Sequence, residues 1–332
     1  MSDDIPIIDF TPWREGGAAG RAEVARQVAE ACERIGFFVV TGHGVPEPTV
    51  ARAYGAAKAF FALPLEEKLA IRRPRPEQNR GYIQVGEETL ARFTGAETPP
   101  DLKEIFAIGP DAVPDEPYFT GPAAYPSFAP NLWPARPAGF REAVLAYWED
   151  LQRLARTTTA IFARALGLPD GWFEPFLDRD ISMLRLILYP EPKGPALPGQ
   201  LRAGAHSDLN IVTFIRNEAS AGGLQVRRRD GRWIDAPALP GSFVVNLGDL
   251  MARWTNDRWV STLHRVAMPP EGSAAGSDRL ALVFFLSPNY DATIRCIESC
   301  AGPGEPPKYP PVTLAEYRTA IFARAQNPRA AE

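Results

Sequence analysis

The sequence predicts a mixed α/β protein with a mainly β core, an antiparallel sandwich or barrel flanked by helices. Between residues 181 and 290, short β-rich runs follow one another, and glycine- or proline-bearing turns separate several of them. No ten-residue helical pattern lies between these runs, which argues against a parallel sheet built from strand–helix–strand units. Elsewhere, apolar residues recur three and four apart over long segments, as they do in helices that pack on a core.

The first half of the chain contributes two strands and most of the helices. We expect, in chain order, a strand over 5–10, a helix over 21–36 that ends at Gly36, a buried strand in 37–46, a helix over 54–71 that is broken near Pro64, and a long helix over 138–168. Residues 72–136 carry many prolines and aromatic residues with little periodicity. We predict long loops there, running over a site.

The second half contributes the β core and a terminal helix. The expected strands lie in "SMLRLILYP", "NIVTFIRN", "GGLQVRRR", "WIDAP", "SFVVNLGD", "TLHRVAM" and "RLALVFFLSPN". "GSAAGS" at 272–277 is typical of a flexible hairpin tip. Thr313 and Glu316 match a capping box at the start of a helix over 313–325.

Composition and charge exclude several classes of protein. Of 332 residues, 45% are hydrophobic and 23% are charged, and the net charge is −4. This is an ordinary globular composition without the basic excess of a nucleic-acid-binding protein, so we expect no nucleic-acid partner. No run is long enough to span a membrane, no secretion signal is visible, and three cysteines form no CxxC motif. We therefore expect a cytoplasmic protein with no membrane partner, and make no prediction of its oligomeric state.

A histidine and an aspartate at the head of one β-rich run are the first chemical clue. In "AGAHSDLNIVTFI", His206 and Asp208 lie two residues apart, so on a strand both project from the same face. Such a pair can satisfy itself through a hydrogen bond, and it can also hold a divalent metal. His264, in "STLHRVAMP", lies in another strand-like run. Two imidazoles and one carboxylate on neighbouring strands would form the facial triad of non-haem Fe(II) oxygenases, whereas structural zinc normally takes four protein ligands that usually include cysteine.

An arginine at the start of the last β-rich run is the second clue. Arg279 shares one strand face with Ala281, Val283 and Phe285. An arginine that points inward is costly unless it meets an anion, and its planar fork matches a carboxylate. The alternative is an ordinary surface arginine. Together with the metal triad, Arg279 favours an iron site with a carboxylate co-substrate.

The order "HSD", "HRV", "RLALVFF" resembles the 2-oxoglutarate/Fe(II)-dependent dioxygenases of the isopenicillin N synthase-like family. "IPIIDF" and "GFFVVTGHGVP" are similar to that family's N-terminal region, and the likeness extends from about residue 5 to 290. The resemblance implies a double-stranded β-helix, or jelly roll, with flanking helices. It also implies Fe(II) held by His206, Asp208 and His264. Arg279 would bind the distal carboxylate of 2-oxoglutarate, and Tyr189 would donate a further hydrogen bond to it.

Three features depart from the family pattern. Ala281 stands where the family usually has serine, which removes one hydroxyl donor to the co-substrate and costs roughly 1.5–3 kcal/mol if nothing compensates. Ile187 stands where many plant members have asparagine. The segment between His264 and Arg279 is longer than usual, and a loop at "PEGSAAGS" can absorb the extra length.

The sequence says less about the residues that bind the primary substrate. Arg185 shares a face with Tyr189, so it points into the barrel and needs a partner. Two partners are open to it, a substrate carboxylate and a protein carboxylate, and we favour the substrate slightly. Phe285 would wall the pocket against the substrate. Residues 79–88 and the C-terminal helix are candidates for a lid.

Three other polar residues are expected to be structural. His43 lies between two glycines after a buried strand and is read as a turn residue. Asn246 and Asp249, in "NLGDL", are read as turn or cap groups.

The function predicted from these residues is an oxidoreductase. The enzyme would use Fe(II), 2-oxoglutarate and O2, and would couple decarboxylation of 2-oxoglutarate to hydroxylation, desaturation or cyclisation of a small molecule. One alternative is an Fe(II) oxidase that needs no 2-oxoglutarate, and a remote one is a non-catalytic β-barrel binding protein. We divide the chain into an N-terminal region (1–178), the β-helix core (179–290) and a C-terminal extension (291–332).

Overall fold

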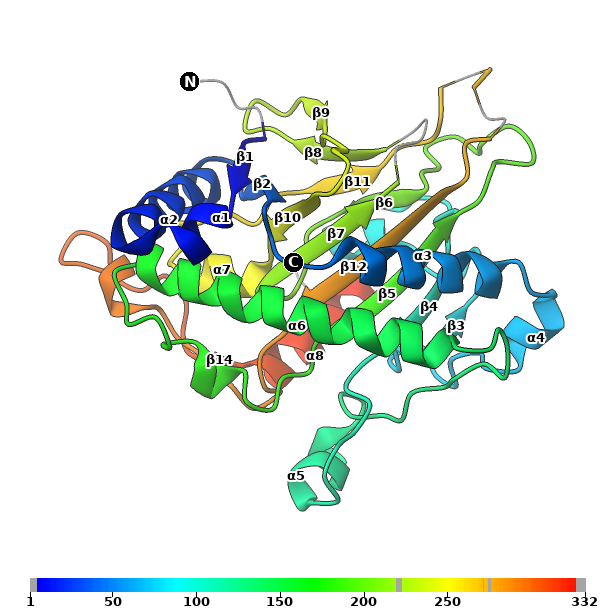
Figure 1. Cartoon of the computed structure of the whole chain (residues 1–332), viewed down its shortest axis with the longest axis horizontal. Helices are drawn as coiled ribbons and strands as arrows, with labels where there is room; N and C mark the ends of the chain where they lie inside the picture. The colour runs from blue at the N-terminus through cyan, green and yellow to red at the C-terminus, as the bar shows by residue number, and fades with distance from the viewer. Residues whose placement is uncertain (1–4, 219–222, 271, 274–275, 327–332) are drawn as a thin grey trace.

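The computed structural model describes residues 5–218, 223–270, 272–273 and 276–326. Two β-sheets form the centre of the molecule, and helices cover the outer face of the larger one (Figure 1). The antiparallel core and the flanking helices confirm the predicted fold class. None of the described helices has both the length and the apolar character needed to cross a membrane.

The larger sheet has eight strands in the order β1-β2-β10-β7-β12-β5-β4-β3. All its neighbouring pairs are antiparallel except β1 and β2. Its strands are β1 (Ile7–Asp9), β2 (Phe37–Thr41), β3 (Gly81–Ile83), β4 (Glu104–Ile108), β5 (Met183–Tyr189), β7 (Val212–Asn217), β10 (Phe243–Leu247) and β12 (Arg279–Leu286).

The smaller sheet has four strands in the order β6-β11-β8-β9. They are β6 (Ala203–His206), β8 (Leu224–Arg227), β9 (Trp233–Asp235) and β11 (His264–Val266), and a separate pair joins β13 (Thr293–Ile294) to β14 (Val312–Thr313). The two sheets bury a second apolar cluster, which includes Ile187, Val226 and Val283. This cluster lies on the sheet face opposite the main core.

The main core lies between the larger sheet and its helices. α6 (Phe140–Ala165) packs against α2 (Gly17–Arg34), α3 (Glu47–Phe61) and β12. Its buried side chains recur three and four apart, among them Val144, Leu151, Leu154 and Phe162, which confirms the predicted long helix. Figure 1 shows α6 lying across the strands in front of the sheet.

Most of the predicted elements are present. α2 ends before Gly36, whose φ of 67° is the left-handed conformation that favours glycine. α3 and α4 (Leu65–Leu69) are separated at residues 62–64, as predicted. α8 (Leu314–Gln326) starts with the predicted capping box, because Thr313 N donates to Glu316 Oε2 and Glu316 N donates to Thr313 Oγ1.

The expectation of long loops over 72–136 is wrong in part. The segment contains β3, β4, a 3₁₀ turn η1 (Leu90–Thr94), the short helix α5 (Pro117–Thr120) and the turn η2 (Pro122–Ala124). β4 is fully buried and pairs with β5. It was missed because a strand that is covered on both faces shows no period-two alternation of apolar and polar residues. The remaining elements are α1 (Thr11–Glu15), α7 (Asp249–Trp254), η3 (Glu174–Phe176) and η4 (Glu298–Cys300). The predicted tip at 272–277 lies partly outside the described residues.

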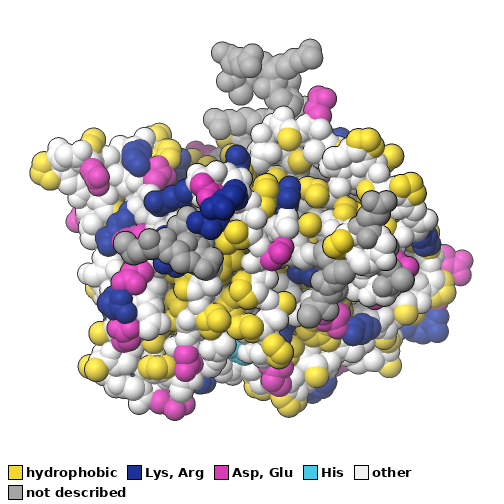
Figure 2. Space-filling model, turned by 90° about the horizontal axis from the view of Figure 1, so that it is seen from above, with side chains coloured by type: hydrophobic (Ala, Val, Ile, Leu, Met, Phe, Trp, Pro, Cys, Tyr) yellow, Lys and Arg dark blue, Asp and Glu magenta, His cyan; other side chains and the backbone are white. Residues whose placement is uncertain are grey.

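Figure 2 shows one face of the molecule. Lys and Arg side chains alternate there with Asp and Glu side chains, and hydrophobic side chains gather near the centre of the face.

Candidate active site

The two predicted histidines are direct neighbours across the smaller sheet. His206 ends β6, His264 begins β11, and the two are register partners in the antiparallel pair. Asp208 follows two residues after β6 ends. One ligand atom from each of the three residues lies within 4.8 Å of the others. Pairing of β6 with β11 thus brings together residues that are far apart in the sequence.

Hydrogen bonds fix the orientation of both imidazole rings. His206 Nδ1 lies 2.7 Å from the Gly204 carbonyl oxygen, and His264 Nδ1 lies 3.1 Å from that of Thr262. Each Nδ1 must carry its proton to donate to a carbonyl, so each Nε2 keeps a free lone pair. Both Nε2 atoms lie 3.8 Å from Asp208 Oδ1. Burial, with the His264 ring beside it, lowers the pKa of His206 to about 3, which keeps its imidazole neutral.

Two neutral donors hold the other oxygen of Asp208. Thr213 Oγ1 donates to Asp208 Oδ2 at 2.5 Å, and Asn246 Nδ2 donates to the same atom at 2.8 Å. Oδ1 is left facing the two Nε2 atoms. Two nitrogens and one carboxylate oxygen that face a common point are the donor set that non-haem Fe(II) takes, so the residues present fit that ion.

The predicted co-substrate residues are also direct neighbours. Arg279 and Tyr189 are register partners on β12 and β5, and the Arg279 guanidinium carbon lies 5.2 Å from the Tyr189 ring centroid. Arg279 is buried and donates through Nη2 to Asn217 Oδ1, while Nη1 has no hydrogen-bond partner among the residues that the structure describes. Burial lowers the pKa of this guanidinium, and Tyr189 opposes that effect. An orphaned donor on a buried cation is suited to a carboxylate ligand.

One cavity of about 380 Å³ joins the candidate metal-binding cluster, which is His206, Asp208 and His264, to Arg279. His206, Asp208, His264, Arg279 and Tyr189 all line it. Ala281 and Ile187, which depart from the family pattern, line it too and are register partners. The five residues predicted to bind metal and co-substrate are therefore brought together.

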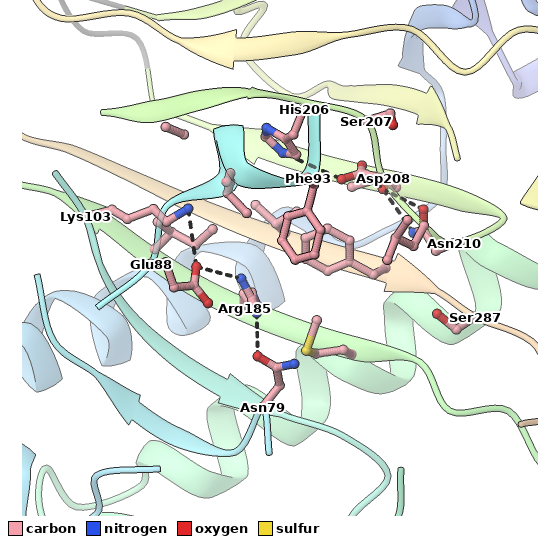
Figure 3. A pocket seen from close by; sticks show the side chains of 18 of the residues that line it. Asn79, Glu88, Phe93, Lys103, Arg185, His206, Ser207, Asp208, Asn210 and Ser287 are labelled. Carbon is pink, nitrogen blue, oxygen red and sulfur yellow. Dashed lines mark hydrogen bonds and ion pairs between the residues drawn. The ribbon is translucent and has the colours of Figure 1, made fainter. Parts of the chain in front are cut away.

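A charged network lies beside the cluster, and Figure 3 shows Glu88 between Lys103 and Arg185. Lys103 Nζ lies 3.3 Å from Glu88 Oε2 and 2.9 Å from Asp101 Oδ2. Arg185 contacts Glu88 Oε2 at 3.2 Å and donates to Asn79 Oδ1 at 2.6 Å. Arg185 thus has the protein carboxylate that we ranked second among its partners. It also lines the cavity, so its role toward a substrate stays a prediction.

Aromatic side chains line the rest of the cavity. Phe285 lines it, as predicted, with the Arg185 guanidinium carbon 5.9 Å from its ring centroid. Phe93 of η1 and Phe322 of α8 also line it, and their rings form a T-shaped pair with centroids 5.4 Å apart. Both predicted lid segments, residues 79–88 and the C-terminal helix, contribute lining residues.

His43 is structural, as predicted. Its Nδ1 accepts from Val45 N at 3.1 Å and its Nε2 lies 2.9 Å from the Gly241 carbonyl oxygen. Burial lowers the pKa of His43 and favours this neutral form. The metal-binding cluster does not include it.

Asn246 was misjudged from the sequence. It is a buried residue of β10 rather than a turn group, and it contacts Asp208 directly. Asn217 and Thr213 were missed altogether. Their signal was present in "NIVTFIRN", where Thr213, Ile215 and Asn217 share one strand face. Asp249, by contrast, begins α7 as a cap-region residue.

Comparisons with known proteins identify the family. Residues 5–136 match the model of the non-haem dioxygenase in morphine synthesis N-terminal region, and residues 181–288 match that of the 2OG-Fe(II) oxygenase superfamily. The chain is 37% identical over 316 residues to the 2-oxoglutarate-Fe(II) type oxidoreductase hxnY of Emericella nidulans, covering 94% of this chain and 87% of the relative. The chain belongs to the 2OG-Fe(II) oxygenase superfamily.

Solved structures agree with this assignment. A full-length Neurospora crassa protein in complex with alpha-KG and thymine superposes with a TM-score of 0.82 at 30% identity, covering 96% of each chain. JOX2 in complex with 2OG, Fe and JA gives a TM-score of 0.76 at 28% identity, covering 96% of this chain and 85% of that one. This oxygenase is therefore a 2-oxoglutarate- and Fe(II)-dependent enzyme with a jelly-roll core. Neither the oxidase without 2-oxoglutarate nor the non-catalytic binding protein is favoured.

Proposed function

We propose that His206, Asp208 and His264 hold Fe(II) through Nε2, Oδ1 and Nε2. The supporting observation is the convergence of these three atoms within 4.8 Å, with each opposite atom engaged by a hydrogen bond. Bound Fe(II), together with 2-oxoglutarate and O2, supplies the oxidising chemistry of this family. The protein's part is to hold the ligands, orient both carbon substrates and exclude water.

We further propose that Arg279 and Tyr189 bind the distal carboxylate of 2-oxoglutarate. The unpartnered Nη1 of Arg279 points to one ligand bond not supplied by the protein. Asn217 holds the other side of the fork, so the guanidinium is oriented before the ligand arrives. Ala281 offers no hydrogen-bond donor to this carboxylate. Tyr189 and Arg279 therefore bind it without the hydroxyl group that the family serine usually adds.

Anaerobic titration of the Fe(II)-loaded enzyme with 2-oxoglutarate tests this assignment. Arg279→Ala should weaken 2-oxoglutarate binding about tenfold to a hundredfold or more, because a charge-assisted hydrogen bond is lost. Ala281→Ser should strengthen it several-fold by restoring a hydroxyl donor. Ala281→Val is the matched control, since it adds bulk without a donor and should not strengthen binding. Unchanged affinity in Arg279→Ala would contradict the proposal.

We propose that the primary substrate is a small molecule bound in the remaining cavity, walled by Phe285. Thymine in the Neurospora crassa structure is one example of a small ligand in a relative. We also propose a cytoplasmic location. Cys32, Cys296 and Cys300 are all free, which suits a reducing compartment.

A further inference from the structure

The cavity has two ends, which two neighbouring strands define. The side chains of Met183, Arg185, Ile187 and Tyr189 all line it from β5. The six-residue interval from Tyr189 to Met183 spans about 20 Å of strand. Arg279 lies opposite Tyr189, and Phe285 lies opposite Met183. The Arg279 end is assigned to 2-oxoglutarate, so the Phe285 end is left for the primary substrate.

Three of the cations that line the cavity have a carboxylate beside them. Lys103 and Arg185 share Glu88, and Arg73 lies 3.5 Å from Glu87 and 3.7 Å from Glu88. These pairs balance their own charge, so none of them calls for an anionic ligand.

Arg80 is a buried cation that makes no ion pair with a carboxylate of the described residues. Its three nitrogen groups donate to the backbone carbonyls of Asn79, Ser127 and Ala129, at 2.7–3.1 Å. Gly109 makes room for it, since a Cβ atom there would lie 1.9 Å from Arg80 Nη2. The hydrogen bonds satisfy its donors and fix its position, but carbonyl oxygens do not neutralise its charge.

Arg318 brings a second uncompensated charge to the same place. It lies on α8, is half-buried and lines the cavity with Arg80. Burial, with the nearby Arg318 cation, lowers the pKa of Arg80 to about 10. Burial also lowers the pKa of Arg318 itself. Within the described part of the chain, no hydrogen bond or ion pair joins Arg318 to any group.

Arg80 and Arg318 line the same cavity, and their like charges repel each other across it, more strongly where they are buried. α8 is anchored independently of Arg318, because Leu314 N and Ala315 N donate to the carbonyls of Ala292 and Tyr290 and the Leu314 side chain is buried. A bound anion would offset the repulsion, and a planar carboxylate matches the arginine fork.

We propose that Arg318, next to Arg80, binds a carboxylate group of the primary substrate. This inference rests on the proposed function, because the reacting part of the substrate must lie near His206, Asp208 and His264. Phe93, Phe285 and Phe322 line the same cavity and suit an apolar part of the substrate. The substrate class is thus a small organic acid whose carboxylate is separated from the oxidised carbon by an apolar segment.

Calorimetric titration of the enzyme loaded with Fe(II) and 2-oxoglutarate, without O2, tests this inference. The probes are phenylacetate and hexanoate, each compared with its neutral primary amide. At least one acid should bind roughly tenfold or more tightly than its amide, because the amide lacks the charge that the arginines recognise. Arg318→Gln should remove that preference, and Arg318→Lys should keep part of it, since lysine retains the charge but not the fork.

Arg92→Gln is the matched control. Arg92 also lines the cavity, from η1, but it is exposed and water screens its charge. It should leave the preference for the acid unchanged. If neither acid binds more tightly than its amide, or if Arg92→Gln and Arg318→Gln act alike, the inference is wrong. Arg318→Gln should keep the affinity of the wild type for 2-oxoglutarate. If the wild type did not bind 2-oxoglutarate at all, the proposed function itself would be contradicted.

Discussion

Asp208 turns its Oδ1 atom toward His206 and His264 because two neutral donors, Thr213 and Asn246, hold its Oδ2 atom. Of these donors, Asn246 comes from β10 of the larger sheet, whereas the histidines belong to the smaller sheet. Asn246→Ala would let the carboxylate rotate and offer either oxygen. We expect Fe(II) affinity to fall about tenfold to a hundredfold, as metal titration would measure.

Asn289→Ala is a suitable control for that variant. Asn289 is equally buried and makes several hydrogen bonds, to Arg179 N, Asp178 Oδ1 and the Pro175 carbonyl, but it is not part of the site. Its loss should lower the melting temperature and leave Fe(II) affinity unchanged. Equal losses of metal affinity in both variants would mean that Asn246 acts only through stability.

The residues to which we assign the chemistry could be named from the sequence, and those that orient them could not. His206, Asp208 and Arg279 stand out because histidine is rare in this chain and a charged residue on an apolar strand is costly. Asn246 and Asn217 have no such cost at a strand end, where an asparagine is ordinary. Only the pairing of β10 with β7, and of β12 with β7, brings their amides to the charged groups.

At the scale of elements, β4 is the informative miss. A strand covered on both faces shows no alternation, and prolines on either side of the segment gave it the character of a loop. β12 and β5 were predicted because each is a short apolar run that ends near a proline and lies among other β-rich runs. β4 borders the charged network through Lys103, the residue just before it.

The carboxylate of Glu88 links this network to acid stability. Burial alone would raise its pKa, but Arg185, Lys103 and Arg73 outweigh burial and lower the pKa to about 2 from an ordinary 4.5. A depressed pKa in the folded state stabilises the fold above pH 4.5, and that contribution is lost as the pH falls toward 2. Up to about 3 kcal/mol of unfolding free energy depends on it.

Glu88→Gln should therefore flatten the dependence of unfolding free energy on pH between pH 5 and 3. Urea denaturation at several pH values would measure this. Arg185→Gln should move the loss of stability to higher pH, because Glu88 would lose one of its cations. If the unfolding free energy of Glu88→Gln fell between pH 5 and 3 as steeply as that of the wild type, Glu88 would not cause the loss of stability in acid.

At the scale of the whole molecule, the proposed co-substrate and substrate ends of the cavity belong to different parts of the chain. His206, His264 and Arg279 lie on the two sheets and Asp208 follows β6, whereas Arg318 and Phe322 come from α8, which packs on η1. Ending the chain after Pro311 would remove α8 and leave every strand of both large sheets in place. Fe(II) and 2-oxoglutarate should still bind with nearly wild-type affinity. Binding of phenylacetate or hexanoate should fall to the level of the amides, as calorimetry would show. Loss of 2-oxoglutarate binding on truncation would mean that α8 supports the whole cavity rather than its outer end.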